Sequence, residues 1–271
     1  MLRWKPIQND FIAIHVGRKR PDAEKPYYWT GLYYYKGLLI DTGCAYTATE
    51  TADFLERSNL DIKVILITHF HEDHVGGAAE LKERFNVDIY APEESTELLK
   101  DPPKLPFYRQ IVWGQPKSVE AEPLKEGIFK VDDLPVIVYR TPGHSFDHMA
   151  FSINDVIFIG DLISTKMPLI ALKGENYLEI INSLKKILDL EFRVAYSSTM
   201  EWNKSSLEET LKNFLTLKRR IDMLWRKGFT TEQIVQKLFS NVPEIVLIME
   251  QMSSKEWSRE NLVKSFLGII D

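Results

Sequence analysis

The most constraining feature of this sequence is residues 68–77, which read Thr-His-Phe-His-Glu-Asp-His-Val-Gly-Gly. Three of the six histidines, His69, His71 and His74, fall within six positions, and Asp73 stands beside the last of them. An imidazole nitrogen suits zinc, and a neighbouring carboxylate can bind a second metal or orient a metal-bound water. The pattern therefore predicts a metal site.

The residues on either side of this cluster predict where it lies. Residues 62–67 form a β-branched apolar run typical of a buried strand, and residues 77–85 have the apolar spacing of a helix. The cluster is therefore expected on a turn at the carboxyl end of a strand. Ligands of α/β folds collect at such ends, because a rigid scaffold there holds side chains that still meet solvent.

The run His-x-His-x-Asp-His followed by Gly-Gly resembles the metal-binding motif of the metallo-β-lactamase superfamily of metal-dependent hydrolases. The resemblance implies that His69 and His71 bind a first metal, while Asp73 and His74 bind a second. Flavodiiron oxygen reductases share the fold but typically have a glutamate at the second ligand position. A histidine at position 71 therefore favours zinc hydrolysis over redox iron.

The resemblance also implies the fold and the domain organisation. It extends over roughly the first two hundred residues and implies an α+β, four-layer αββα sandwich for residues 1–203. From residue 204 the pattern becomes helical, without the alternation of strands. We therefore expect residues 204–271 to form a small helical domain or cap.

Further site residues follow from the same resemblance. Residues 141–148 come after two predicted strands and resemble the loop of the third ligand, so His144 is expected to complete the first site. Asp161, at the end of a predicted hairpin, is expected to bridge the two metals. Asp41 resembles the aspartate that supports the metal site from behind its ligands, with an Asx turn as the alternative. His148 is expected to lie near the site.

The sequence departs from the family after the strand predicted at residues 193–196. A histidine is expected there as the last ligand of the second metal, but residues 197–199 are Ser-Ser-Thr and no histidine follows His148. Glu201 or a water is one substitute, and a weak or empty second site is the alternative. With Glu201 the oxygen-rich ligand set would favour Mn²⁺ or Fe²⁺ over Zn²⁺.

Composition narrows the class of protein. The 271 residues are 44% hydrophobic and 27% charged, as is ordinary for a globular protein. The net charge of -5 gives no sign of a nucleic-acid or membrane-surface partner. No apolar run approaches the roughly eighteen residues of a membrane helix, and the start lacks a signal-peptide core, so we expect a cytoplasmic protein. The single cysteine, Cys44, excludes an internal disulfide and is interpreted as a small buried hydrophobe.

Residues 101–127 interrupt the regular pattern. Five prolines forbid long regular elements there, and bulky aromatic residues stand among them. An irregular segment of this length inside a domain is usually functional or disordered, and we interpret it as a loop that covers the substrate. The other predicted elements are strands at 10–16, 32–35, 38–41, 87–90, 129–132, 136–140, 149–153 and 156–159, and helices at 45–59, 93–100, 177–190, 211–225 and from 230.

These features predict a hydrolase in which a zinc-activated hydroxide attacks an ester, thioester or lactone of a small molecule. Asp73 is expected to orient the hydroxide and to carry a proton towards the leaving group. Two alternatives stay open. Arg219, Arg220, Gly228 and residues 229–243 resemble the C-terminal domain of the lactamase-β-like endoribonucleases, which would act on single-stranded RNA. The missing last histidine instead fits a non-catalytic, metal-poor binding protein.

Overall fold

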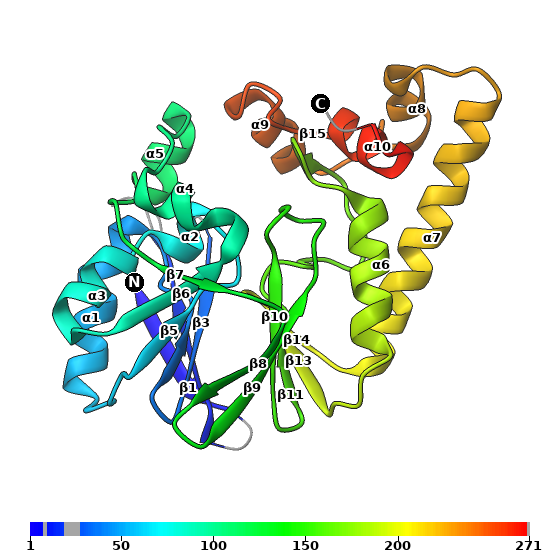
Figure 1. The fold of residues 1–271 in the computed structure, drawn as a ribbon. Helices are drawn as coiled ribbons and strands as arrows, with labels where there is room; N and C mark the ends of the chain where they lie inside the picture. Colours follow the sequence, from blue (N-terminus) through cyan, green and yellow to red (C-terminus); the bar gives the residue numbers. More distant parts are fainter. Residues whose placement is uncertain (8–9, 19–27, 270–271) are drawn as a thin grey trace. The chain divides into compact units, whose positions relative to one another are not determined.

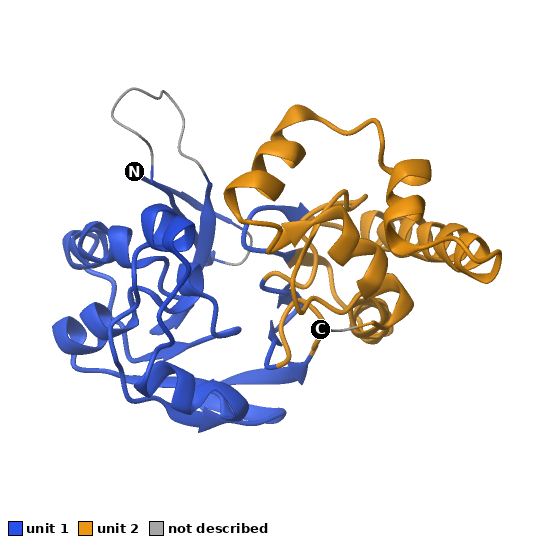
Figure 2. Ribbon diagram, turned by 90° about the horizontal axis from the view of Figure 1, so that it is seen from above, with its two compact units in different colours: residues 1–140, 147–160, 196–201 blue, residues 141–146, 161–195, 202–271 orange. Residues whose placement is uncertain are grey.

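The computed structural model describes residues 1–7, 10–18 and 28–269, drawn as a ribbon in Figure 1. Within these residues the chain forms two units. Unit 1 comprises residues 1–140, 147–160 and 196–201, and unit 2 comprises the segments between and after them, coloured separately in Figure 2. Whether residues 204–271 form a domain of their own, as the sequence predicts, stays a prediction.

Unit 1 contains a seven-stranded sheet in which the strands are neighbours in chain order. The first four strands pair antiparallel, and β4 to β7 pair parallel. Strands β3 and β4, expected at 32–35 and 38–41, form a hairpin, and its turn residues Lys36 and Gly37 both have the positive φ that a tight two-residue turn requires. The strands are β1 (Leu2–Pro6), β2 (Ile12–Val16), β3 (Thr30–Tyr35), β4 (Leu38–Ile40), β5 (Val64–Leu66), β6 (Asp88–Pro92) and β7 (Glu122–Leu124).

Two helices, α1 (Ala48–Arg57) and α3 (Ala78–Phe85), pack on this sheet and close its core. Leu55 and Leu81 are fully buried among strand residues such as Ile65, and burying each leucine stabilises the fold by roughly 1.5 to 3 kcal/mol. The other short helices in the described part of unit 1 are η2 (Ala45–Thr47), α2 (Glu72–Val75), η3 (Glu93–Ser95), α4 (Thr96–Lys100) and α5 (Phe107–Trp113).

A second sheet has the strand order β14-β13-β11-β10-β9-β8. Within unit 1 an aromatic cluster joins it to the first sheet, because the ring of Phe158 lies 4.7 Å from that of Tyr33 and 5.2 Å from that of Phe11. The strands are β8 (Gly127–Val131), β9 (Leu134–Arg140), β10 (Met149–Ile153), β11 (Val156–Phe158), β13 (Val194–Tyr196) and β14 (Glu201–Trp202).

Unit 2 is mainly helical, as predicted for the end of the chain. Tyr177 stacks on Phe266 and meets Phe214 edge to face, which ties three of its helices together. No described helix is long and apolar enough to cross a membrane. The helices are α6 (Tyr177–Leu188), α7 (Lys204–Arg226), α8 (Thr231–Leu238), α9 (Glu244–Met252) and α10 (Arg259–Leu267), and the two-residue strands β12 (Ala171–Leu172) and β15 (Trp257–Ser258) pair beside them.

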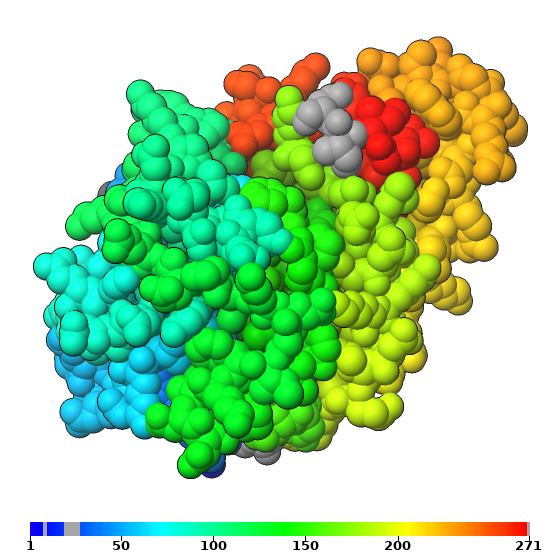
Figure 3. All heavy atoms as spheres, viewed as in Figure 1, coloured from blue at the N-terminus to red at the C-terminus, as the bar shows by residue number. Residues whose placement is uncertain are grey.

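The structure corrects two expectations about secondary structure. Residues 101–127 are not wholly irregular, because they contain α5 and β7. Pro106 precedes the first turn of α5, where a missing N–H costs nothing, and Pro123 lies in β7 at the edge of the sheet. None of the α5 residues is buried, and the segment forms part of the surface in Figure 3. Strand β1 was not predicted from the sequence. Four of its five residues are exposed, so the segment lacks the alternation of apolar and polar residues that indicates a strand.

Candidate metal site

The histidine cluster lies where the sequence predicts it, directly after β5 and at the start of α2. His69, His71 and His74 are all buried. The ring of His69 lies 4.7 Å from that of His71 and 4.1 Å from that of His74. Three buried imidazoles at this spacing form a dense set of nitrogen donors, the chemistry that zinc prefers.

Asp41 lies behind this cluster, as the resemblance implies. Parallel pairing of β4 with β5 brings it next to Thr68, whose backbone N–H and hydroxyl donate to the carboxylate at 2.8 and 2.9 Å. His74 Nδ1 lies 2.8 Å from Asp41 Oδ2. Because a carboxylate only accepts, Nδ1 carries the proton and Nε2 offers its lone pair, which is the arrangement of a metal-binding histidine.

Thr68 gives His69 the same tautomer. Its hydroxyl donates to Asp41, so its oxygen accepts from His69 Nδ1 at 3.0 Å. The Nε2 atom of His69 is then the one that can bind a metal. The hydrogen bonds of Asp41 and Thr68 therefore leave the Nε2 atoms of His69 and His74 as the atoms that can bind a metal, and such imidazole ligands fit a zinc ion.

Asp73 is the partly exposed carboxylate of the motif, with 21% of its side chain accessible. One oxygen, Oδ2, accepts a hydrogen bond from the Thr30 hydroxyl at 3.1 Å and lies 3.7 Å from His74 Nε2. The contact with Thr30 restrains the carboxylate beside the histidines while leaving it accessible to water.

His144 lies in the loop of residues 141–146, which belongs to unit 2. The loop packs against the start of α6, where a Cβ added to Gly143 would come within 2.5 Å of the Ile180 nitrogen. The Gly143 carbonyl also accepts from the backbone N–H of Asn176 at 2.7 Å. Glycine is required at position 143 both for this close approach and for its φ of +138°.

Glu175 orients His144 and was not predicted from the sequence. Its Oε1 lies 2.7 Å from His144 Nδ1, and its Oε2 accepts from the Leu172 backbone N–H at 2.9 Å. His144 Nε2 then faces Asp161, with 3.8 Å between that nitrogen and the carboxylate oxygen. This repeats, in unit 2, the carboxylate–histidine pairing of Asp41 with His74.

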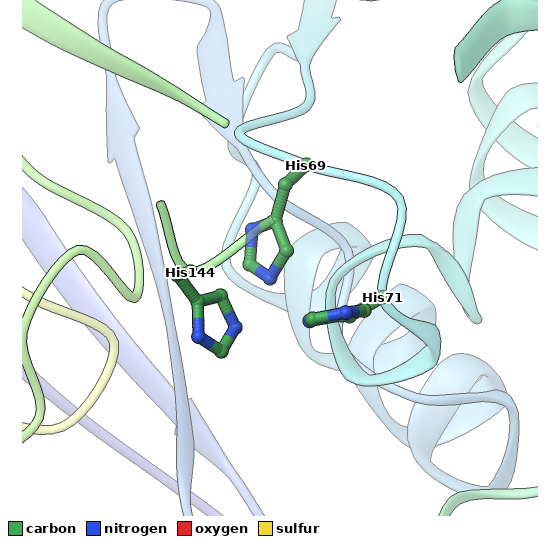
Figure 4. Close-up of side chains that lie close together, drawn as sticks. All are labelled: His69, His71 and His144. Atoms are coloured by element: carbon green, nitrogen blue, oxygen red, sulfur yellow. The ribbon is translucent and has the colours of Figure 1, made fainter. Parts of the chain in front are cut away.

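Figure 4 draws the side chains of His69 and His71, which belong to unit 1, and of His144, which belongs to unit 2. These three histidines form one group of residues suited to a metal ion, and His69, His74 and Asp161 form another. Asp73, expected in the second ligand set, is in neither group. Metal binding by the predicted ligands stays a prediction.

Two further polar residues support the loop of residues 68–72, which carries His69 and His71 and is called the motif loop below. Asp147, which was not predicted as a site residue, is fully buried, and its Oδ2 accepts from the Phe70 backbone N–H at 2.9 Å. His148 is also buried, with its ring 5.1 Å from that of His69, and Gly160 leaves it room because an added Cβ would lie 2.6 Å from His148 Nε2. Asp147 stands within the Gly-His-Ser-Phe-Asp-His run, which was the available signal.

The turn that lacks the expected histidine is held by its own hydrogen bonds. The Ser197 amide donates to the Met200 carbonyl at 2.9 Å, and the Met200 amide donates to the Ser197 hydroxyl at 3.1 Å. The Ser197 carbonyl accepts from the Tyr33 hydroxyl at 2.6 Å. These bonds commit the backbone and hydroxyl of Ser197 to the turn.

Glu201, the suggested substitute for that histidine, lines a different cleft of unit 1. It is exposed and lines a cleft of about 310 Å³ together with Arg3, Lys5 and His15. His15 lies on β2, and burial together with the charges of Arg3 and Lys5 lowers its pKa to about 4. Among the described residues, neither group suited to a metal includes Glu201.

A partly buried ion pair, in which the carboxylate is the more buried partner, links residues 101–127 to the motif loop. Arg109 Nε and Nη2 donate to the two oxygens of Glu72, each at 2.6 Å. Only 3% of the Glu72 side chain and 14% of the Arg109 side chain are exposed. Burial raises the pKa of Glu72, and the Arg109 charge and hydrogen bonds oppose that shift. The geometry is the bidentate one that makes arginine–carboxylate pairs strong.

Removing one partner of this pair should destabilise the protein more than removing both. Arg109→Met leaves the Glu72 carboxylate buried without its counter-charge, and we expect a loss of about 3 to 5 kcal/mol in the free energy of unfolding by urea. The double variant with Glu72→Gln should recover part of it. Arg84→Met, at the surface ion pairs with Asp53 and Glu56, is the control and should cost much less. Equal losses for the two arginines would contradict the burial argument.

Glu175→Gln should weaken the binding of the first metal about 10- to 100-fold, because the amide holds His144 less firmly and lowers its basicity. The measurement is a zinc titration against a competing chelating dye. Glu179→Gln, on the exposed side of α6, is the matched control. An affinity within about threefold of the parent in the Glu175 variant would show that Glu175 does not support a metal ligand.

Comparison with known proteins agrees with this geometry. A sequence model described as the Metallo-beta-lactamase superfamily matches residues 36–198, more than half of the chain. The chain belongs to this superfamily. The predicted metallo-β-lactamase fold is confirmed by solved structures such as a metallo-beta-lactamase family protein from Thermus thermophilus, with TM-score 0.66 and 19% identity over 95% of this chain and 91% of that one.

Curated relatives carry more specific names. A hydroxyacylglutathione hydrolase from Bdellovibrio bacteriovorus is 31% identical over 176 residues, which are 64% of this chain and 61% of the relative. One from Thiobacillus denitrificans is 30% identical over 53% of this chain and 48% of its own length. The chain thus spans about half to three fifths of these two relatives. A lactamase-like protein from Aspergillus fumigatus is 26% identical over 78% of this chain and 64% of its own length.

Proposed function

We propose that this chain is a metal-dependent hydrolase of a small thioester. The observation that carries the proposal is the buried cluster of His69, His71 and His74, with Asp41 fixing one imidazole from behind and Asp73 accessible beside it. Membership of the superfamily supports hydrolysis as the reaction. The relatives named hydroxyacylglutathione hydrolase favour a thioester over an ester or lactone.

The proposed ligands of the first zinc are His69, His71 and His144. The second metal would be held by Asp73, His74 and Asp161. A bound zinc ion supplies Lewis acidity towards the substrate carbonyl and lowers the pKa of water in its shell.

Asp73 is the proposed catalytic residue. The Thr30 hydroxyl holds one of its oxygens, and the accessible part of the carboxylate can accept the proton of the attacking water. After attack at the carbonyl carbon breaks the C–S bond, the same group can carry the proton to the leaving thiolate. His148 and Asp147, both buried, would keep the motif loop in position through His69 and the Phe70 amide.

A panel of substrates tests the proposal. The zinc-loaded protein should hydrolyse a hydroxyacyl thioester of glutathione, and kcat/KM should be at least about tenfold lower for the matched oxygen ester, a lactone and single-stranded RNA. His71→Ala, treated in the same way, is the control for contaminating activity. Cleavage of RNA without cleavage of the thioester would replace this proposal with the endoribonuclease alternative, which otherwise stays an untested prediction.

The second metal should leave before the first. Residues 197–199 offer hydroxyls in place of the expected imidazole, and hydroxyls bind zinc poorly. Mild chelation of the zinc-loaded protein, followed by metal counting, should therefore give a singly loaded form. Ser198→His should strengthen retention of the second ion, whereas Ser205→His, on an exposed part of α7, should not. Simultaneous loss of both ions, unchanged by Ser198→His, would refute the argument that the site is incomplete.

A further inference from the structure

Besides the cleft that Glu201 lines, unit 1 contains a cavity of about 150 Å³ beside the motif loop. The segment that follows α4 and continues through α5 forms one side of it, and the motif loop with α2 forms another. Its walls are mainly apolar and include Val75, Leu98, Leu105 and Val119. Three of these side chains lie outside the family motif, and Val75, which lies inside it, is not one of the predicted metal ligands.

None of the predicted metal ligands lines this cavity. Phe70 and Glu72 line it, and they alternate along the chain with His69 and His71. Neighbouring residues of an extended backbone point to opposite sides, and His71 has the extended dihedrals φ -62° and ψ 145°. The backbone therefore directs the Glu72 side chain away from that of His71, while the ring of Phe70 lies between the cavity and His71, 4.8 Å from the His71 ring.

The wall formed by the proline-rich segment is built by hydrogen bonds. Gln115 donates to the Pro103 carbonyl and accepts from the Leu105 amide, both at 3.0 Å. Gln110 donates to the Leu105 carbonyl at 2.6 Å, and the Val119 amide donates to the Leu99 carbonyl at 2.9 Å. A cavity held open in this way binds a ligand without the entropy cost of ordering its wall.

The polar groups of the cavity define the charge of its ligand. Glu72 and Arg109 neutralise each other through their bidentate pair, so they offer no net charge. Lys104 and Lys117 also line the cavity and are exposed. No carboxylate among the described residues pairs with either ammonium group, so both can meet an anion at the rim.

We propose that this cavity binds a small carboxylate with an apolar body of about five to six carbon atoms, separately from the predicted metal site. A cavity of roughly 150 Å³ with apolar walls holds a six-carbon ring such as benzene, which sets the size of the body. The carboxylate of the ligand meets Lys104 and Lys117 while the apolar body contacts Leu98 and Val119. Phe70 and Glu72 of the motif loop form one wall of the occupied cavity.

Calorimetric titration with hexanoate tests this site on the full chain. We expect saturable binding with Kd of a few millimolar or tighter, at the same affinity within about twofold in metal-free and zinc-loaded protein. Acetate lacks the apolar body and hexylamine has the wrong charge, so each should bind at least about tenfold more weakly. The backbone amide signals of Leu105 and Val119 should shift during the titration, and that of Leu172 in unit 2 should not.

Charge reversal at the rim provides the matched variants. K104E/K117E should weaken hexanoate binding at least about tenfold, because two attractive contacts become repulsive. K130E, an exposed lysine on β8, should leave it unchanged. All three positions are exposed, so the variants should fold. Binding that requires zinc, that persists in K104E/K117E, or that is absent up to about 10 mM hexanoate would overturn the proposal; none of these results bears on thioester hydrolysis.

Discussion

Replacing Asp73 with alanine is expected to lower kcat/KM for thioester hydrolysis by about a hundredfold to ten-thousandfold, the usual contribution of a positioned general base. The carboxylate is partly exposed and its contacts are to Thr30 and His74, so its removal leaves the core packing intact. The free energy of unfolding should accordingly stay close to that of the parent. The measurement is steady-state kinetics on zinc-loaded protein.

Two comparisons make the Asp73 result specific. Asp88→Ala changes an exposed carboxylate at the start of β6 and should leave kcat/KM unchanged. Metal counting on Asp73→Ala separates loss of the general base from loss of the second metal. Asp73 is a proposed ligand of the second metal only, so a variant that keeps both ions but loses activity has lost the general base. Activity of Asp73→Ala within about threefold of the parent would show that the role is misassigned.

Asp41→Asn is expected to weaken zinc binding about 10- to 100-fold. The asparagine keeps the shape of the side chain but offers one acceptor oxygen, whereas the buried carboxylate serves two donors of Thr68 and the Nδ1–H of His74. The amide would also present an N–H towards one of these groups, which disturbs the tautomers of both His74 and His69. Competition with a chelating dye measures the change.

Asp61→Asn, at an exposed aspartate in the connection before β5, is the control for Asp41→Asn. Because Asp41 is buried, the variant should also unfold at a lower urea concentration, so metal affinity is to be compared under conditions where both proteins are folded. Unchanged zinc affinity in folded Asp41→Asn would mean that the carboxylate only closes the turn after β4, as in the Asx-turn alternative.

The parts of the site that follow local patterns could be predicted from the sequence. The apolar run before Thr68 indicated β5, and the spacing after Gly77 indicated α3, so the position of His69, His71 and His74 at a strand end followed directly. Asp41 was placed by its resemblance to the family's supporting aspartate, and the structure brings it to the site through the parallel pairing of β4 with β5.

The partners that hold these residues could not be predicted. Glu175 reaches His144 across 31 positions of the chain, and Arg109 reaches Glu72 across 37, so no periodicity links them. Helix α5 was missed for a local reason, since the prolines around it mark its boundaries and were interpreted as breaks throughout the segment. Whether this segment covers the substrate stays a prediction.

The most direct test of the account is the dependence of thioester hydrolysis on added zinc. Protein freed of metal by chelation should hydrolyse the hydroxyacyl thioester no faster than the uncatalysed reaction, and activity should return in proportion to zinc and level off at no more than two equivalents. His144→Ala should regain little activity over the same titration. Full hydrolysis by the metal-free protein, or equal recovery in His144→Ala, would contradict the assignment of a metal-dependent hydrolase built on these histidines.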